Sequence, residues 1–547
     1  MERLPVEDVI DDVRAALAGR GVAVLTAEPG AGKTTVVPLR LLDHTPGRIV
    51  VLEPRRVATR AAARRMAATL GERVGETVGY RTRDDHRTGP NTRIEVVTEG
   101  ILTRRLQTDR SLAGTGLVVF DEFHERNQHG DLGLALALDA RRTHRPDLRI
   151  LVMSATLDVA RVAALLGDAP VITSEGRTHP VDVRWLPKPK TRRLEEAVAD
   201  AVVRALREQD DGDVLVFLPG MADLRRAATA LASANANPGV DVHLLHGSLP
   251  SDEQDAALAP SATGARKVIL STDIAESSLT VEGVTAVVDA GLARVPRFDA
   301  GTSMTRLKTI GASKASTDQR AGRAGRTRPG IAYRLWSKME HAARQPHGDP
   351  EIAHVDLADL ALELATWGVD DPADLPFLDQ PPRRALGDAR ALLRMLGAID
   401  EANAVTDAGR DMSGLPLHPR LAHMVVESIV AGRGWVACVA ATLLEDEQPL
   451  QPLHARPRAF DLAHRVGVST DEPLDERDVG QVVALAYPDR IARGRGGGQF
   501  SLPSGLRLWL AKDDPLADAP FLVVARTDGH RKNPRILAAA WVQQDHD

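Results

Sequence analysis

Aromatic residues are scarce in this chain, which has 8 Phe, 6 Trp and 3 Tyr among its 547 residues. Hydrophobic residues still make up 43%, so the cores must be built mainly from Ala, Leu and Val. That fraction, with 26% charged residues, is typical of a folded protein and excludes general disorder. One core rarely grows past roughly 250 to 300 residues, so several domains are expected.

Cysteine is almost absent as well. Cys438 stands alone, which excludes an internal disulfide and a Cys-based metal cluster. It lies in the apolar stretch 435–439 and is predicted to be a buried core residue. No apolar run approaches the roughly 20 residues of a membrane span, and the first residues lack a signal-peptide pattern. These absences predict a soluble cytoplasmic protein with no membrane partner.

An excess of positive charge is also missing, because the formal net charge is −6. A uniformly basic coat for nucleic acid is therefore not expected, although a basic channel inside an acidic shell stays open. Only nine of the 69 basic residues are lysine. The skew toward arginine is typical of a GC-rich genome, so a lone arginine carries little weight.

Short apolar runs alternate with helical stretches up to about residue 340. Continuous apolar strands between helices predict parallel sheets covered on both faces. The predicted strands form two sets, at 22–27, 48–52, 93–97, 116–120 and 148–153, and then at 213–218, 242–245, 267–271, 284–289 and 331–335. Two sets indicate two α/β domains, with residues 174–190 and their three prolines as the connector. After about residue 345 the pattern is mainly helical, and short β-like runs follow residue 499.

A phosphate-binding loop is the strongest signal. It follows a predicted strand and precedes a predicted helix, where glycines let backbone N–H groups turn toward phosphate oxygens. Lys33 is expected to reach the β- and γ-phosphates, and the Thr34 hydroxyl to bind Mg²⁺. The first position is Ala27 instead of glycine, a mild departure. The predicted nucleotide-binding residues here are Ala27, Glu28, Pro29, Gly30, Ala31, Gly32, Lys33, Thr34 and Thr35.

An acidic pair, Asp121-Glu122, ends the apolar strand at 116–120. In a phosphate-loop fold this is where a metal-binding acid belongs. Asp121 is predicted to hold Mg²⁺ directly or through water, with Glu122 beside it. Glu122 is also placed to orient and deprotonate the attacking water. The sequence therefore predicts Thr34, Asp121 and Glu122 around the metal.

The segment Gln319–Arg326 has arginines three residues apart, which share one face of a helix. Small residues between them let that face approach another surface closely. Arg323 and Arg326 are predicted to point at a γ-phosphate as arginine fingers supplied by the second domain.

The order of these motifs resembles that of superfamily 2 helicases. Between the acidic pair and Gln319–Arg326 lie Ser154-Ala155-Thr156 and the segment Ser271–Ser278. The set is similar to the DEAH-box RNA helicase family, and residues 75–81 and 98–102 support that branch. The resemblance covers nearly the whole chain and is very specific up to about residue 425.

The resemblance implies ATP and Mg²⁺ between two RecA-like domains, and single-stranded RNA held without strong sequence preference. Ser154 and Thr156 would couple nucleotide state to domain motion. Arg56, Thr98 and Thr272 would lie along the RNA backbone. A monomer is expected, and any protein partner stays unidentified. A DNA helicase, or a nucleic-acid-binding ATPase switch that does not unwind, stays open as an alternative.

Further roles follow from the same resemblance. His124 would bridge to Gln319 across the cleft, and Arg65 would stack on the base. The family places an aromatic residue opposite that base, but residues 255–258 contain none, so selectivity for ATP over other nucleoside triphosphates is not expected. Two more departures are Phe123 in place of Ala and Asp273 in place of Asn.

The resemblance also divides the chain into five domains. These are RecA-like domains at 1–174 and 175–343, a winged helix at 344–416, a helical bundle at 417–490 and an OB-like tail at 491–547. A hairpin at Arg294–Leu307, with its turn at 299–301, would part the duplex. Members of this branch normally continue well past this length, which indicates a C-terminally shortened chain.

Overall fold

The computed structural model describes residues 4–28, 30–155, 159–176, 179–189, 191–234, 239–261, 264–276, 281–299, 304–326, 328–471, 473–530 and 533–542. Within these ranges, no helix combines the length and apolar character that a membrane crossing needs. The chain forms two compact units. The first comprises Met1–Val295, Leu307–Glu351 and Pro376–Asp379, and the second comprises Pro296–Arg306, Ile352–Leu375 and Gln380–Asp547.

The first RecA-like domain contains an eight-stranded sheet of order β4-β3-β5-β2-β6-β7-β1-β8. Its pairs are parallel except β3 with β4. The strands are β1 (Val22–Ala27), β2 (Arg48–Leu52), β3 (Val78–Arg81), β4 (His86–Arg87), β5 (Ile94–Val97), β6 (Thr115–Phe120), β7 (Arg149–Ser154) and β8 (Val171–Ser174). The five strands predicted for this sheet match its inner strands to within one residue. The edge strands β4 and β8, and β3 next to β4, are short and were not predicted.

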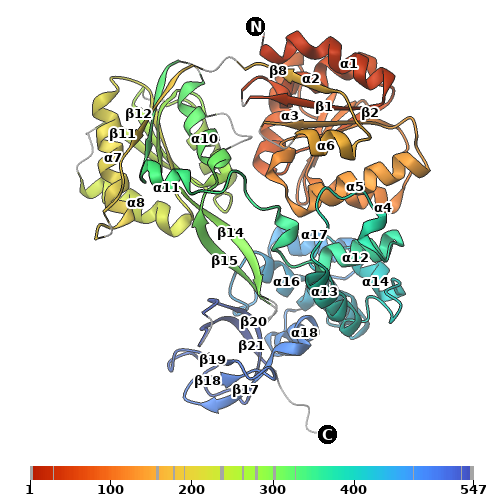
Figure 1. Cartoon of the computed structure of the whole chain (residues 1–547). Helices are drawn as coiled ribbons and strands as arrows, with labels where there is room; N and C mark the ends of the chain where they lie inside the picture. The colour runs from red at the N-terminus through yellow and green to blue at the C-terminus, as the bar shows by residue number, and fades with distance from the viewer. Residues whose placement is uncertain are drawn as a thin grey trace. The chain divides into compact units, whose positions relative to one another are not determined.

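Helices cover both faces of this sheet (Figure 1). They are α1 (Ile10–Gly19), α2 (Lys33–Leu41), α3 (Arg56–Leu70), α4 (Glu99–Thr108), α5 (Gln128–Thr143) and α6 (Val159–Leu165). On one face, α1, α2 and α3 bury Val, Leu, Ile and Ala side chains against alternate residues of the strands. Gly133 of α5 brings that helix close to Phe120 and Leu52 on the other face. Burial on both faces explains why the strands are continuously apolar.

The second RecA-like domain has a six-stranded parallel sheet of order β11-β12-β10-β13-β16-β9. Its strands are β9 (Val181–Trp185), β10 (Asp213–Phe217), β11 (Val240–Leu245), β12 (Arg266–Ser271), β13 (Val284–Asp289) and β16 (Gly330–Arg334). Its helices are α7 (Leu194–Glu208), α8 (Met221–Ser233), α9 (Ser251–Leu258), α10 (Lys314–Gly322) and α11 (Lys338–Ala342). The five predicted strands agree to within two residues.

The predicted connector at 174–190 contains an unpredicted strand. β9 lies inside it and pairs with β16 at the edge of the second sheet. Pro180 directly precedes β9, and Pro187 follows it after one residue. Prolines are tolerated beside an edge strand because that strand has a free side without ladder hydrogen bonds. Their density made this segment resemble a loop.

The predicted hairpin is present as a two-stranded sheet of β14 (Leu292–Asp299) and β15 (Met304–Gly311). The tip of its turn, residues 300–303, lies outside the described residues. The strands extend from the second RecA-like domain in light green (Figure 1). Residues Pro296–Arg306 belong to the second unit, so the hairpin is shared by both.

The second unit is helical before it becomes a sheet. Its helices are α12 (Ala358–Trp367), α13 (Arg383–Met395), α14 (Asp407–Ser413), α15 (Pro419–Val430), α16 (Gly434–Glu445), α17 (Pro457–Arg465) and α18 (Val479–Ala486). An isolated bridge between Ile399 and Val405 joins the two sides of the loop between α13 and α14. Cys438 on α16 is fully buried, which confirms its predicted core position. Burial raises the pKa of its thiol to about 12.

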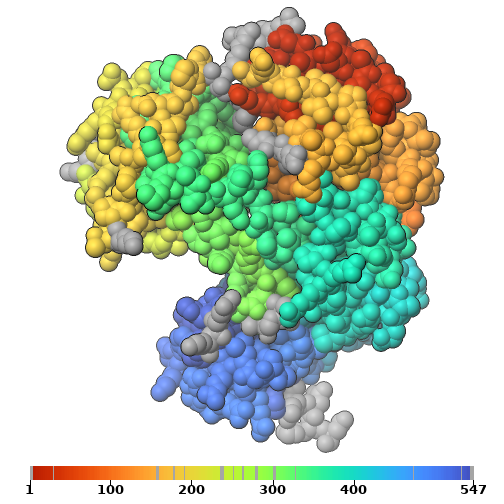
Figure 2. Space-filling model, viewed as in Figure 1, coloured from red at the N-terminus to blue at the C-terminus, as the bar shows by residue number. Residues whose placement is uncertain are grey.

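A five-stranded antiparallel sheet of order β19-β18-β17-β20-β21 ends the described chain. Its strands are β17 (Ile491–Gly496), β18 (Gln499–Ser501), β19 (Arg507–Trp509), β20 (Phe521–Thr527) and β21 (Ile536–Trp541). Met304 from the hairpin packs in the apolar core of this sheet with Phe500 and Leu522. Figure 2 shows the surface of this sheet in blue.

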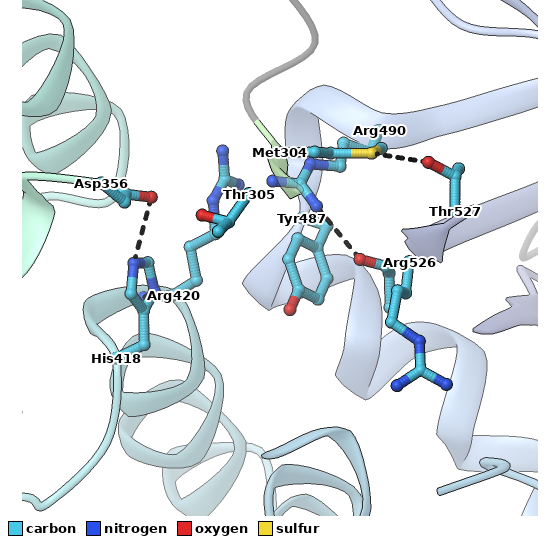
Figure 3. A pocket seen from close by; sticks show the side chains of 10 residues that line it. Met304, Thr305, Asp356, His418, Arg420, Tyr487, Arg490, Arg526 and Thr527 are labelled. Carbon is cyan, nitrogen blue, oxygen red and sulfur yellow. Dashed lines mark hydrogen bonds and ion pairs between the residues drawn. The ribbon is translucent and has the colours of Figure 1, made fainter. Parts of the chain in front are cut away.

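A pocket of about 190 Å³ lies where the hairpin meets α15, the segment 487–490 and β20. Figure 3 shows the Tyr487 ring in its wall. The guanidinium carbons of Arg420 and Arg490 lie 5.4 Å and 4.6 Å from the centre of that ring. Arg420 also forms a two-pronged ion pair with Asp489, at 2.6 Å and 2.8 Å. The pocket wall next to the hairpin residues Met304 and Thr305 is therefore held together by arginine–tyrosine stacking and an ion pair.

Candidate nucleotide and nucleic-acid site

The phosphate loop joins β1 to α2, as its sequence predicts. Gly30 and Gly32 have φ values of 91° and 96°, which side-chain-bearing residues rarely adopt. A Cβ on Gly32 would also come within 2.9 Å of the Leu4 side chain. Lys33 is buried at the first position of α2, and its Nζ donates to the Ala27 carbonyl at 2.5 Å. Pro29 lies outside the described residues.

The strand order places the acidic pair beside this loop. β6, β7 and β1 are consecutive neighbours, so their carboxyl ends meet at one edge of the sheet. Asp121 follows β6, Ser154 ends β7, and the loop follows β1. The Thr34 hydroxyl donates to Asp121 Oδ2, which brings a hydroxyl and a carboxylate oxygen together. Mg²⁺ prefers such hard oxygen ligands and is often held by one or two protein groups plus phosphates, so these two residues fit the ion.

Asp121 and Glu122 have contrasting electrostatic surroundings. Both are buried, at 2% and 8% exposure. Burial, together with the Glu122 charge, raises the pKa of Asp121 to about 7. Burial also favours neutral Glu122, but Lys33, His124, Arg323 and Arg326 outweigh it and lower the pKa of Glu122. Glu122 is thereby kept as a carboxylate, the form that can accept a proton.

The backbone around Glu122 is unusual. Its φ is 48°, in the left-handed region, where a non-glycine residue costs about 1–3 kcal/mol. The following residues form η3 (Phe123–Glu125), and Glu125 donates its N–H to the Glu122 carbonyl at 2.9 Å. His124 Nδ1 lies 3.5 Å from Glu122 Oε2, and His124 Nε2 lies 3.0 Å from Gln319 Nε2. The predicted contact between His124 and Gln319 is therefore present in the first unit.

The three arginines of Gln319–Arg326 have different surroundings. The helix α10 ends at Gly322, and Arg323 begins η5 (Arg323–Gly325). Arg320 is 1% exposed and forms ion pairs with Glu276 at 2.8 Å and Asp289 at 3.1 Å. It supports the fold of the second domain instead of facing the loop.

Arg323 and Arg326 lie near Glu122, and both lower its pKa. Arg323 Nε also donates to the main-chain carbonyl of Glu276 at 2.9 Å. Burial and the neighbouring Arg326 charge lower the pKa of Arg323. Burial lowers the pKa of Arg326 to about 10, although Glu122 opposes this shift. Arg326 Nε is buried without a hydrogen-bond partner and is the atom nearest to the Cβ position of Gly30. Two neighbouring buried cations beside a phosphate loop fit a phosphate group, whose charge would relieve their repulsion.

The remaining predicted residues lie on the same unit. Ser154 is buried, and its Oγ has no hydrogen-bond partner. Thr156 lies outside the described residues, as do Ser277 and Ser278. Arg56 is exposed and bonds to Asp84 at 2.6 Å. Thr98 precedes α4, and Thr272 precedes η4 (Asp273–Ala275).

The surroundings predicted for the base contain two exposed ion pairs. Arg65 lies on α3 with its Nη1 3.8 Å from Glu282 Oε1. Its neighbour Arg64 lies 3.3 Å from Asp255, in the segment where no aromatic residue occurs. All four side chains are more than half exposed, so these pairs stabilise little.

Sequence reasoning gave no role to Arg55 or to the acids around it. Arg55 lies directly before α3 and contacts Glu125 of the first domain and Asp273 of the second. Burial alone would lower its pKa, but Glu125, Asp273 and Glu276 raise it overall. The arginine doublet after β2 was the available signal, but it does not specify which arginine turns inward.

This fold and site define a nucleoside-triphosphate hydrolase with two RecA-like domains. Residues 10–165 match the model described as DEAD/DEAH box helicase, and residues 196–328 match the helicase conserved C-terminal domain. The chain is 43% identical to the ATP-dependent RNA helicase HrpB of Escherichia coli (strain K12), with 100% of this chain and 69% of that protein covered. The chain belongs to the DEAD/DEAH box helicase family.

Other relatives support this assignment. The ATP-dependent RNA helicase HrpA of Escherichia coli (strain K12) is 35% identical over 85% of this chain and 36% of its own length. The crystal structure of the E. coli DExH-box NTPase HrpB aligns with a TM-score of 0.89 at 42% identity, over 99% of this chain and 69% of that one. A second crystal structure, of the E. coli DEAH/RHA helicase HrpB, aligns with a TM-score of 0.91 at 40% identity and covers 71% of that chain.

Proposed function

We propose that this chain is an ATP-dependent RNA helicase and translocase. It couples hydrolysis of Mg²⁺-ATP to movement along single-stranded RNA and to duplex unwinding. The observation that carries this proposal is the meeting of two half-sites. Lys33, Thr34 and Glu122 come from the first RecA-like domain, and Arg323 and Arg326 come from the second.

The first domain supplies binding and proton transfer. Backbone N–H groups of the loop and Lys33 hold the phosphates, while Thr34 and Asp121 hold Mg²⁺, which would neutralise charge on the phosphate oxygens when bound. Glu122 orients the attacking water and accepts its proton. The contact between His124 and Gln319 holds the two domains together beside Glu122.

The second domain completes the charge stabilisation. Arg323 and Arg326 act on the charge that develops at the transferred phosphoryl group, an effect worth about 10³–10⁵ in rate for such arginines. Since they come from the other domain, hydrolysis requires a closed cleft. Ser154 and Thr156 couple the state of the nucleotide to this domain closure. Repeated closing with ATP and opening after hydrolysis moves the enzyme along the strand in one direction.

RNA is the polymer that we propose this chain binds. Arg56, Thr98 and Thr272 contact its phosphates, which carry little sequence information. The names of HrpB and HrpA as RNA helicases support this choice. Because no aromatic residue lies at 255–258, the enzyme accepts other nucleoside triphosphates besides ATP.

The test measures ATP hydrolysis and unwinding on one preparation. RNA should stimulate hydrolysis more than DNA of the same sequence at the same salt concentration, and ATP should separate an RNA duplex with a single-stranded tail. Equal or greater stimulation by DNA would favour a DNA helicase. Stimulated hydrolysis without strand separation would favour an ATPase switch.

A further inference from the structure

The beginning of α3 is a place where the first RecA-like domain touches the second. Val57 and Ala58 pack against an apolar cluster of the second domain that includes Ile274. Two residues before Val57, Arg55 donates from Nη1 to the main-chain carbonyl of Asp273 at 2.5 Å. One short segment therefore makes both apolar and polar contacts with the other domain.

The same guanidinium reaches the turn that carries Glu122. Arg55 Nε donates to Glu125 Oε2 at 3.3 Å, and Nη2 lies 3.3 Å from Glu125 Oε1. The Glu125 N–H in turn bonds to the Glu122 carbonyl at 2.9 Å. A single side chain thus connects Asp273 of the second domain with the backbone of the proposed general base.

The two ends of this connection adjoin the proposed RNA contacts. Arg56 directly follows Arg55, and Thr272 directly precedes Asp273. Arg56 is exposed, with its side chain 60% accessible, whereas the Arg55 side chain is only 22% accessible. RNA held by Arg56 and Thr272 would fix the spacing between the two segments that Arg55 joins.

We propose that Arg55 is the positioning residue through which bound RNA accelerates hydrolysis. RNA holds the two segments together, and the Arg55 bonds to Asp273 and Glu125 transmit that closure to the turn of Glu122. Arginine suits this role because its rigid fork can satisfy two acceptors in different directions at once. The inference rests on the proposed function, since it assigns a route for activation by RNA.

The main experiment compares Arg55→Lys and Arg55→Ala with the parent chain. Lysine keeps the charge but cannot reproduce the fork. In both variants the maximal RNA-stimulated rate should fall by about tenfold or more, within the usual range of a coupling between two sites. Hydrolysis without RNA should stay within about twofold, and fluorescent-nucleotide affinity should be unchanged.

Two further variants separate the contacts. Asp273→Asn should change little, because the bond uses the main-chain carbonyl and the carboxylate is 57% exposed and 3.8 Å away. Glu125→Gln keeps an acceptor oxygen but removes the charge, and it should reduce maximal stimulation partly. Arg56→Ala should instead raise the RNA concentration needed for half-maximal stimulation, because it removes a proposed RNA contact and leaves the connection intact.

Several results would overturn the inference. Parent-level maximal stimulation in Arg55→Lys and Arg55→Ala would show that the signal does not pass through this residue. An equal loss of hydrolysis with and without RNA would show that Arg55 only supports the nucleotide site. If Arg55→Ala does not fold, Arg55→Lys and Glu125→Gln decide. If the proposed RNA function itself is wrong, RNA will not stimulate hydrolysis by the parent chain. That result differs from a failure of the inference, in which RNA stimulates the parent chain and the Arg55 variants equally.

Discussion

Glu122 combines a strained backbone with a buried, charge-stabilised carboxylate. Glu122→Gln keeps the shape and removes the proton acceptor, so we expect hydrolysis to fall by about 10²–10⁴. Nucleotide binding should persist, and RNA should accumulate in a complex that contains unhydrolysed ATP. Steady-state hydrolysis and filter binding of labelled RNA measure these effects. Turnover at the parent rate would show that another group accepts the proton.

Arg323 and Arg320 lie three residues apart, but their substitution by alanine should impair different properties. Arg323→Ala removes a group that faces Glu122, so hydrolysis should fall by about 10³ or more with little change in thermal stability. Arg320→Ala leaves Asp289 and Glu276 without their ion-pair partner, which should cost about 3–5 kcal/mol of folding free energy.

Hydrolysis rates and thermal unfolding of both variants separate the two roles. RNA affinity without nucleotide should barely change in Arg323→Ala, because its side chain is buried beside the nucleotide site. A large loss of RNA affinity with unchanged turnover would instead place Arg323 on the RNA path.

The hairpin of β14 and β15 is the element whose role depends most on the tertiary structure. Replacing Val295–Thr305 by a short Gly-Ser link should leave RNA-stimulated hydrolysis and single-strand translocation largely intact, whereas strand separation should fall sharply. If the hairpin acts as a wedge, it blocks one strand of the duplex and takes no part in hydrolysis. The replacement should therefore reduce unwinding without reducing ATP hydrolysis. Parallel assays of ATP hydrolysis and duplex unwinding measure this. Unchanged unwinding would show that the hairpin has no role in strand separation. Loss of both activities would show that it stabilises the structure of the second RecA-like domain.

Met304 supplies the control for that replacement. It is 6% exposed in the core of the C-terminal sheet, so Met304→Ala should cost about 2–5 kcal/mol. Leu307 lies on the same strand but is 54% exposed, and Leu307→Ala should change stability by less than about 0.5 kcal/mol. If Met304→Ala alone abolishes unwinding, the loss in the replacement reflects the damaged sheet and not a missing wedge.

At the scale of the whole molecule, the nucleotide site belongs entirely to the first unit. A ligand that binds only the folded state stabilises it by about 2.7 kcal/mol at 100 times its Kd. Mg²⁺-ADP should therefore stabilise the first unit and leave the C-terminal sheet nearly unchanged. Calorimetry gives the size of the effect, and hydrogen exchange in β1 and β20 gives its location.

Lys33→Ala should remove this stabilisation, because its buried ammonium is the group that we propose binds the phosphates. Lys338→Ala is the matched control, since Lys338 is exposed on α11. Equal protection of β1 and β20 by Mg²⁺-ADP would show instead that the two units unfold together.

The sequence alone determined the two parallel sheets and the order of the motifs. The inner strands are continuous runs of Val, Ile and Leu, and burial on both faces leaves few alternatives for such runs. The edge strand β9 is less buried than the inner strands and is flanked by prolines, so it was missed. The phosphate loop was equally clear, because Gly30, Gly32, Lys33 and Thr34 must be neighbours in the chain to surround one phosphate group.

Only the tertiary structure decided which residues of each motif act together. Arg320 and Arg323 have the same chemistry and lie three residues apart. Their difference comes from residues distant in sequence, because Arg320 pairs with the carboxylates of Asp289 and Glu276, whereas Arg323 bonds to the Glu276 main-chain carbonyl. The inward turn of Arg55 depends likewise on Glu125 and Asp273. Local spacing determines what a segment can form, but an ion pair across two domains requires long-range packing that one sequence does not display.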